Sequence, residues 1–305
     1  MSVITVRDLR KSYKTVEALQ GISFEVPRGS IYGFLGPNGA GKSTTISILL
    51  QFLHQDSGEV LLFGENVKQN INHLKRRIGF IPDADLPNLS GLRLLKHTGR
   101  YYGLSGQQLR RKIIQVVKDT DAKSFVGRSS RQLSKGQKTR IKVANALMTD
   151  PDLLIADEPT SGLDPIARRQ FLELVSDLAH NQGKTVFLSS HVIGEVEKIC
   201  DHLLILAKGQ VVAQGNFTDI LKLLPSSHRF VVMAEGVSKT YLESLPNVES
   251  VEELSNSRFA LETNNGSHTP QFIKALVNNP DVVLHQYSRD NITLEDLFFQ
   301  VIGHD

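Results

Sequence analysis

Short apolar runs alternate with stretches of helical periodicity along the first two thirds of the chain. Four of the apolar runs are predicted strands: ISFEV (22–26), SIYGFLG (30–36), LLIA (153–156) and TVFLSS (185–190). The last two are continuously apolar, which is typical of strands buried in a parallel sheet covered on both faces. STTISILLQFL (43–53) is a predicted helix, because its large apolar residues recur on one face. The alternation predicts an α/β fold.

Two further patterns indicate how this core is organised. LLILA and QVVAQG flank Lys208-Gly209, a two-residue turn signal that predicts a β-hairpin. Between Asp83 and about residue 150 the chain is richer in helical patterns and basic residues, so we expect a helical subdomain (about 84–150) inserted into the core.

The pattern changes near Leu224-Pro225-Ser226-Ser227, so we expect one domain over 1–224 and an accessory or regulatory domain over 225–305. Strands are predicted at RFVVMAE (229–235), VESVEEL (248–254), RFALETN (258–264) and VVLHQYS (282–288). Helices are predicted at TYLESL (240–245), PQFIKALVN (270–278) and LEDLFFQVI (294–302). The first six of these elements follow the βαββαβ order of a small α+β, ferredoxin-like domain.

Composition narrows the function classes. The formal net charge of +3 over 305 residues is small, which argues against a dedicated nucleic-acid binder. The single cysteine, Cys200, excludes an intrachain disulfide and is expected to be a buried apolar residue. We expect no signal peptide, and the longest apolar run falls short of the roughly 18 residues of a spanning helix. Any membrane part would therefore come from another subunit.

Two basic runs stand out, Lys75-Arg76-Arg77 and Arg110-Arg111-Lys112. We expect both to be solvated helix faces. The alternative is contact with anionic lipid headgroups, if the protein docks at a membrane.

A glycine-rich loop carries the most specific chemical signal. GPNGAGKST (36–44) contains the pattern G-x-x-x-x-G-K-[ST] between a predicted strand and a predicted helix. Glycines let the backbone turn tightly and direct N–H groups at phosphate oxygens, and the helix N-terminus adds positive potential. We expect Lys42 to reach the β and γ phosphates of ATP and the Ser43 hydroxyl to bind Mg²⁺. The alternative, a surface turn, is disfavoured by this setting. The predicted ATP-binding residues of the loop are Gly36, Pro37, Asn38, Gly39, Ala40, Gly41, Lys42, Ser43 and Thr44.

Polar side chains follow two of the predicted buried strands. Asp157 and Glu158 come directly after LLIA, and His191 follows TVFLSS. The carboxyl edge of an open α/β sheet is where ligands bind. We expect Asp157 to hold Mg²⁺ and Glu158 to polarise the attacking water as a general base. A solvated acidic strand end is the alternative. A lone histidine is usually structural, but this position favours a contact with the γ-phosphate.

These residues resemble those of ABC ATPases, the nucleotide-binding subunits of ABC transporters, over about residues 2–220. LSKGQ is similar to the family's signature motif LSGGQ and SGLD is similar to its D-loop. His191 is similar to the switch histidine, and Tyr13 stands where an aromatic residue stacks on adenine. The residues of the two motifs are Leu133, Ser134, Lys135, Gly136 and Gln137, and Ser161, Gly162, Leu163 and Asp164.

The resemblance implies a mechanism that one chain does not complete. ATP would lie between the P-loop of one subunit and the signature motif of another, in a homodimer or a pair with a second ABC ATPase. Ser134 and Gly136 would act across that dimer on the γ-phosphate. A separate integral membrane permease would hold the protein at the cytoplasmic face of the membrane. From the residues alone, LSKGQ is also a helix start capped by Ser134, and both interpretations can hold together.

The chain departs from the family pattern at two positions. Lys135 replaces a glycine of the signature motif. Asp83 stands after IGFIP at the Q-loop position, where the family usually has Gln, so the usual coupling of this loop to the membrane partner is in doubt. The end of the chain, around Leu294–Phe298, is similar to the small extra domain of ATPases that serve ABC-2 type exporters.

Three function classes remain. The first is an ATPase subunit that energises a transporter, most similar to an ABC-2 type exporter. The second is a soluble ABC ATPase that acts on nucleic acid or ribosomes, and the third is an inactive cassette. The chain has one cassette, with no heptads or CxxC motif between Lys42 and Ser134, which favours the transporter and no nucleic-acid partner. Glu158 and His191 argue against an inactive cassette.

Overall fold

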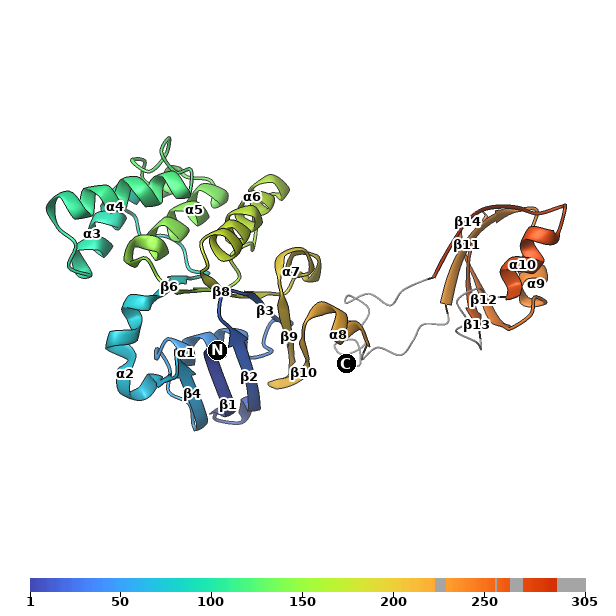
Figure 1. The fold of residues 1–305 in the computed structure, drawn as a ribbon, viewed down its shortest axis with the longest axis horizontal. Helices are drawn as coiled ribbons and strands as arrows, with labels where there is room; N and C mark the ends of the chain where they lie inside the picture. The colour runs from blue at the N-terminus through green and yellow to red at the C-terminus, as the bar shows by residue number, and fades with distance from the viewer. Residues whose placement is uncertain (223–228, 256, 264–270, 290–305) are drawn as a thin grey trace. The chain divides into compact units, whose positions relative to one another are not determined.

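The structure is a computed structural model that describes residues 1–222, 229–255, 257–263 and 271–289. The chain forms two compact units, one spanning Met1–Phe217 and one beginning at Thr218 (Figure 1). We describe each unit separately.

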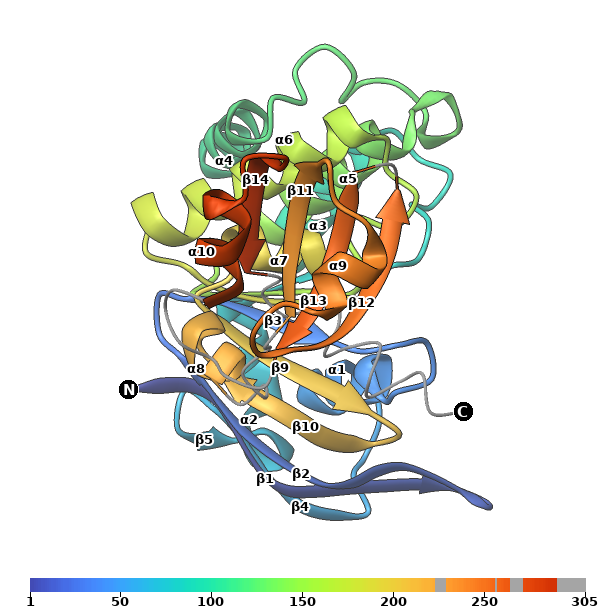
Figure 2. The ribbon, with the colours of Figure 1, turned by 90° about the vertical axis from the view of Figure 1, so that its right-hand side faces the viewer.

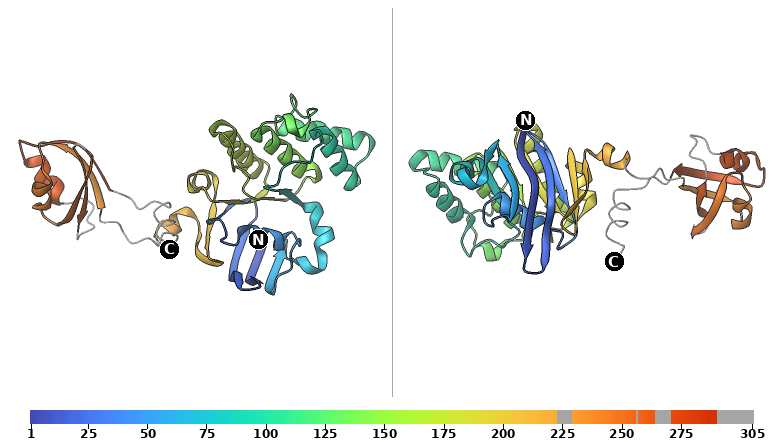
Figure 3. Two further views of the ribbon diagram at one scale, coloured as in Figure 1. Left: turned by 180° about the vertical axis from the view of Figure 1, so that it is seen from behind. Right: turned by 90° about the horizontal axis from the view of Figure 1, so that it is seen from below.

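The described residues of the first unit form two sheets. The antiparallel sheet has the order β2-β1-β4-β5, and its strands are β1 (Ser2–Tyr13), β2 (Val16–Pro27), β4 (Ser57–Leu62) and β5 (Glu65–Asn66). β1 and β2 are long and lie side by side (Figure 3). The sequence pattern predicted only the second half of β2, because the exposed, charged positions of β1 hide its alternation.

The second sheet is the mainly parallel sheet that the apolar runs predicted. Its order is β10-β9-β3-β8-β7-β6, with β3 (Ile31–Leu35), β6 (Ile78–Ile81), β7 (Leu153–Ala156), β8 (Thr185–Ser190), β9 (His202–Ala207) and β10 (Gln210–Gly215). Every residue of β3, β7 and β8 is buried, which confirms that this sheet is covered on both faces. The hairpin β9–β10 is also confirmed. Its turn residues Lys208 and Gly209 both have positive φ, 47° and 76°, which matches the twist of a tight hairpin.

Helices cover the sheets and connect the strands. They are α1 (Lys42–Leu49), α2 (Val67–Leu74), α6 (Pro165–Ser176) and α7 (Ile193–Ile199), while α8 (Phe217–Lys222) starts at the last residue of the first unit and belongs mostly to the second. α1 is shorter than predicted: it ends at Leu49, and Gln51 has a left-handed φ of 54° that stops the helix before Leu53. Between the sheets lies an apolar core in which the Phe24, Phe34 and Phe187 rings pack together.

Three helices separate β6 from β7 in the chain: α3 (Gly91–Tyr101), α4 (Gly106–Asp119) and α5 (Lys135–Ala146). They lie together on one side of the parallel sheet (Figure 1). α3 begins at Ser90, whose hydroxyl accepts a hydrogen bond from the Arg93 N–H, and α5 begins at Ser134. The starts of α3 and α5 thus have a hydroxyl cap for an otherwise unpaired N–H group, whereas α4 has no side-chain cap.

The second unit is a four-stranded antiparallel sheet with two helices on one face (Figure 2). Its described elements are β11 (Arg229–Glu235), α9 (Lys239–Glu243), β12 (Val248–Ser255), β13 (Arg258–Thr263), α10 (Gln271–Asn278) and β14 (Val283–Arg289). The sheet order is β12-β13-β11-β14. Phe230, Leu261 and Phe272 lie in its core. The helix predicted at 294–302, with the Leu294–Phe298 segment, lies outside the described residues.

Candidate functional site

The glycine-rich loop connects the carboxyl end of β3 to the first turn of α1. Gly41 precedes the helix with a φ of 110°, and a Cβ atom there would come within 2.6 Å of the Ala18 carbonyl oxygen. Only glycine satisfies both the conformation and the close approach. The Ala40 N–H donates to the Pro37 carbonyl at 3.2 Å, which keeps the loop compact.

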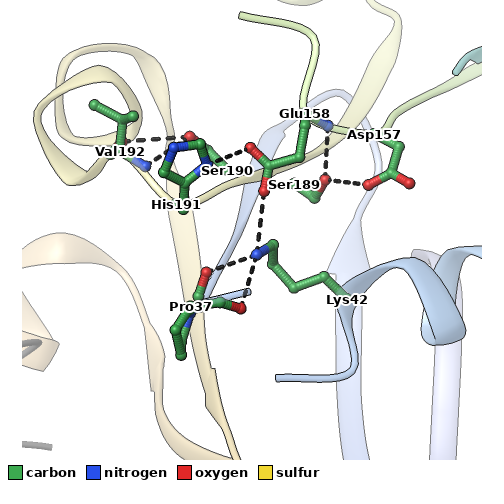
Figure 4. A network of polar contacts seen from close by, with 9 residues as sticks. Pro37, Lys42, Asp157, Glu158, Ser189, Ser190, His191 and Val192 are labelled. Carbon is green, nitrogen blue, oxygen red and sulfur yellow. Dashed lines mark hydrogen bonds and ion pairs between the residues drawn. The ribbon is translucent and has the colours of Figure 1, made fainter. Parts of the chain in front are cut away.

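Lys42 is held at the centre of this loop. Its side chain is only 6% exposed, and the ammonium donates to the carbonyl oxygens of Gly36 at 2.6 Å and Pro37 at 3.1 Å. The same Nζ lies 3.1 Å from Oε1 of Glu158 (Figure 4). A buried ammonium needs such partners, because transfer of an unpaired charge out of water is costly. The structure therefore joins Lys42 and Glu158, which are 116 positions apart in the chain.

Glu158 connects the P-loop to the histidine after β8. Its side chain is 12% exposed, and Oε2 lies 2.7 Å from Nδ1 of His191 (Figure 4). Oε1 is buried, and the Lys42 ammonium is its partner as an ion pair without hydrogen-bond geometry. The backbone of Glu158 has a left-handed φ of 43°, and its N–H donates to Ser189 Oγ at 2.9 Å. Strained non-glycine backbone of this kind clusters at functional sites.

Ser189 is a residue that the sequence analysis missed. It is fully buried in β8, and its hydroxyl donates to Oδ1 of Asp157 at 2.7 Å while it accepts the Glu158 N–H. One hydroxyl thus orients the first acid and the backbone of the second. The available signal was a pair of hydroxyl residues at the end of TVFLSS, two positions before His191.

The residues expected to hold Mg²⁺ suit a hard cation. Ser43 is exposed in the first turn of α1, and Asp157 is half-buried at the end of β7. Ser189 occupies one carboxylate oxygen of Asp157, and the other has no hydrogen-bond partner among the described residues. Mg²⁺ takes oxygen ligands and usually combines one or two protein groups with phosphates and water, so a hydroxyl and a carboxylate fit it.

Tyr13 ends β1 at the turn to β2. Its ring is 45% exposed, and the Lys11 ammonium lies 5.7 Å from the ring centroid. The side chain is thus partly accessible, with the Lys11 ammonium over one face of the ring. None of the described contacts joins Tyr13 to the P-loop.

The signature residues form the start of α5. The Ser134 hydroxyl accepts the Gln137 N–H at 3.3 Å, and the Gln137 side chain accepts the Ser134 N–H at 3.1 Å. This capping box confirms the helix-cap interpretation of LSKGQ. A Cβ on Gly136 would come within 2.7 Å of the Ala167 Cβ, so α5 packs closely on α6 there. Within the described part of the chain, no hydrogen bond or ion pair joins residues 133–137 to residues 36–44.

The SGLD segment links α6 to this helix start. Asp164 caps α6 by accepting the N–H groups of Ile166 at 3.1 Å and Ala167 at 2.9 Å. Leu163 is buried and Ser161 is exposed. Gly162 has a φ of 66°, and the Lys135 ammonium packs against its Cα in the space that a side chain would fill. The lysine that departs from the family pattern therefore contacts the D-loop segment of its own chain.

Asp83 faces cations of α5. It lines a cavity of about 220 Å³ together with Asp85, Lys138, Lys142 and Glu158. Lys142 donates to the Pro82 carbonyl at 3.0 Å, and Lys138 lies 3.0 Å from Asp85. Burial lowers the pKa of Lys142, and the carboxylates of Asp83 and Asp85 act in the opposite direction. The Asp83 carboxylate therefore faces lysine ammonium groups, whose charge a glutamine amide would not neutralise.

Comparisons with known proteins agree with this geometry. Residues 19–161 match the family described as ABC transporter. The Nod factor export ATP-binding protein I of Ralstonia nicotianae is 32% identical over 315 residues, covering 99% of this chain and 94% of that protein. The bacitracin transport ATP-binding protein BcrA of Bacillus licheniformis is 31% identical, covering 99% and 98%. A solved dimeric structure of a bacterial ABC transporter cassette has a TM-score of 0.64 and 25% identity, covering 70% of this chain and 98% of that one.

Proposed function

Because the chain belongs to the ABC transporter family and is one of its ATP-binding, ATP-hydrolysing subunits, we propose that it binds Mg-ATP at the P-loop site and energises export through a separate membrane subunit. The observation that carries the proposal is Glu158, which contacts both Lys42 and His191 at the carboxyl edge of the sheet. The similar Nod factor export and bacitracin transport proteins support export as the direction.

The P-loop residues would bind the phosphates. Backbone N–H groups of residues 36–44 and the N-terminus of α1 provide a positive cradle, and the Lys42 ammonium adds a full charge. Ser43 and Asp157 would hold Mg²⁺, which when bound neutralises charge on the phosphate oxygens. The partly exposed ring of Tyr13 would stack on adenine.

Glu158 would act as the general base on the attacking water. His191 shares a short contact with its carboxylate and would orient it while contacting the γ-phosphate. Ser189 would keep Asp157 and the Glu158 backbone in place, because its hydroxyl bonds to both. A positioned general base contributes roughly 10²–10⁴ in rate.

The signature residues would complete the site of a second subunit. Ser134 and Gly136 lie at a capped helix start, a place where N–H groups and a hydroxyl favour an anion. Their separation from the P-loop within one chain supports action across a homodimer, or a pair with a second ABC ATPase. The solved dimeric cassette supports such pairing.

An apolar groove beside the Asp83 loop would receive the membrane subunit. This cavity of about 370 Å³ is lined by aromatic and aliphatic groups that include Phe52, Phe80 and Tyr102. Phe52 is 66% exposed at its edge. The described residues include no helix that is long and apolar enough to cross a bilayer. We place the protein at the cytoplasmic face of the membrane through this partner, and residues 225–305 would serve as an accessory or regulatory domain.

The test is purification of the tagged full chain from membranes, followed by identification of the co-purifying integral protein and measurement of ATPase activity. We expect a multi-span permease and Mg²⁺-dependent hydrolysis that Glu158→Gln abolishes. Co-purification of ribosomes or nucleic acid, with no membrane protein, would instead support the soluble alternative.

A further inference from the structure

The hairpin formed by α3 and α4 is strongly basic, with one acidic residue, Asp119, at the end of α4. Residues 86–118 contain seven Lys and Arg residues and no Asp or Glu. Since the whole chain has a formal net charge of +3 and this stretch alone carries +7, the remainder carries −4. The net positive charge of the protein therefore arises in this segment, whose helices α3 and α4 lie next to each other (Figure 1).

Most of these cations have no carboxylate partner. The side chains of Arg93, Lys96, Arg100, Arg110 and Arg111 are exposed, and none forms an ion pair with a carboxylate of the described residues. Lys112 differs, because its side chain is largely buried and its ammonium lies 3.8 Å from Asp150. Cations that are not neutralised locally create a positive potential that attracts polyanions.

Three of the exposed cations share one face of α3. Arg93, Lys96 and Arg100 have the spacing i, i+3 and i+7, which places them along one side of the helix. The other side is buried, since Leu95 is fully covered and Gly99 lies directly against Leu109 of α4. We call Arg93, Lys96 and Arg100 the α3 basic face.

The α3 basic face lies on the opposite side of α3 from the apolar groove in which the membrane subunit would dock. Thr98 and Tyr102 of the same segment line that groove. Tyr101 is 82% exposed beside Arg100, and its ring meets the Tyr102 ring edge-on with centroids 5.1 Å apart. Tyrosine is enriched at membrane interfaces, where its ring and hydroxyl suit the headgroup layer. A subunit docked in the groove would leave the α3 basic face uncovered.

We propose that the α3 basic face and Tyr101 bind the headgroups of anionic phospholipids beside the membrane subunit. Each Lys or Arg near an anionic membrane surface strengthens binding by about fivefold, so three together contribute roughly a hundredfold. The inference depends on the proposed function only for the location of the groove. Lipid binding itself requires neither nucleotide nor the membrane partner.

The experiment is flotation of the full chain, without nucleotide, with phosphatidylglycerol-containing vesicles and with pure phosphatidylcholine vesicles. We expect binding to the anionic vesicles only, weakened by salt because exposed charges are screened. The triple variant Arg93→Gln/Lys96→Gln/Arg100→Gln should lose roughly a hundredfold in apparent affinity. The matched control, Lys68→Gln/Lys123→Gln/Lys198→Gln, removes the same charge from exposed positions elsewhere and should bind nearly as the wild type does.

Two outcomes overturn the proposal. One is equal binding of anionic vesicles by the triple variant and the wild type. The other is tighter binding of a single-stranded RNA or DNA oligonucleotide than of vesicles at the same salt concentration, which would assign the face to nucleic acid. The basal ATPase activity of the triple variant, measured in parallel, should equal that of the wild type. Absence of ATPase activity in the wild type would contradict the proposed function. The vesicle result would still test the lipid proposal by itself.

Discussion

The two halves of the proposed nucleotide site are built differently. On the P-loop side, Lys42, Glu158 and His191 form a chain of contacts no longer than 3.1 Å, and Ser189 ties Asp157 to the same group. On the signature side, the side chains of Ser134 and Gln137 each accept the backbone N–H of the other residue. In the first half, the functional side chains contact one another. The second half is a helix start that, among the described residues, makes no hydrogen bond or ion pair with the P-loop. This difference supports the proposal that the signature residues of one chain act on the P-loop site of another subunit.

The largest test of this contrast is Glu158→Gln. Removing the general base should lower kcat for ATP hydrolysis by roughly 10³, while ATP binding persists. Bound, unhydrolysed ATP should then hold two subunits together, so size-exclusion chromatography with Mg-ATP should show a dimer. A variant that stays monomeric with saturating Mg-ATP would count strongly against a composite site.

Lys42→Ala should cost about a hundredfold in ATP affinity, because a hydrogen bond to a charged group contributes roughly 1.5–3 kcal/mol. Isothermal titration calorimetry measures this directly. Lys68→Ala, at an exposed position of α2, is the matched control and should bind as the wild type does. Equal affinity in the Lys42 variant would remove the P-loop assignment.

Mixing variants separates the two halves most sharply. Lys42→Ala and Ser134→Ala subunits should each have low activity. Random pairing makes about half of the dimers mixed, and each mixed dimer has one intact site of two, so activity should recover to about a quarter of wild type. A mixture of Lys42→Ala with Glu158→Gln is the control, because both defects lie on the P-loop side and no intact site forms. Recovery of activity in both mixtures, or in neither, would contradict the division of the site between two subunits.

Ser189→Ala tests how far the P-loop half of the site depends on the hydroxyl that bonds to both acidic residues. It leaves the Glu158 N–H without its acceptor and Asp157 without its donor. Leaving a buried polar group without its partner costs about 1–3 kcal/mol. We expect kcat to fall about tenfold and the Mg²⁺ requirement to rise, with ATP affinity little changed. Ser190→Ala, in the same buried strand but without contact to either acid, should have a much smaller effect.

Asp83→Gln should have the smallest effect, about twofold or less on basal hydrolysis, because removing one partially screened charge contributes only modestly. The carboxylate of Asp83 opposes the effect of burial on Lys142, so the substitution should lower the pKa of Lys142 further. NMR titration of ¹³C-labelled lysine methyl derivatives follows this shift. A collapse of basal activity would place Asp83 in the metal shell instead.

Local patterns predicted the parallel sheet well because its strands are buried on both faces. LLIA and TVFLSS became β7 and β8 with the bounds expected, and Lys208-Gly209 supplied the turn between β9 and β10. Helix ends were less predictable. α1 continues in pattern to Leu53, but the left-handed Gln51 ends it earlier, and nothing in the apolar spacing records a backbone angle.

The residues of the site also differ in how well the sequence predicted them. The positions of Asp157, Glu158 and His191 followed from strand ends, since parallel strands deliver their carboxyl ends to one edge. Strand ends did not predict three other features, because each joins segments far apart in the chain. These are the Lys42–Glu158 ion pair, the two hydrogen bonds of Ser189 and the contact of Lys135 with Gly162. Asp83 departs from the family pattern in sequence, and only the neighbouring lysines of α5 give its charge a physical reason.

The uneven distribution of charge between the α3–α4 hairpin and the rest of the chain gives the protein an electric dipole. In the field of an anionic surface a dipole experiences a torque that acts over about a Debye length, roughly 8–10 Å, before any atoms touch. Collisions then begin with the basic end leading, so a larger fraction of them is productive. A helix pair with such an excess of basic residues sets how fast a subunit finds its place, separately from how tightly it is held there.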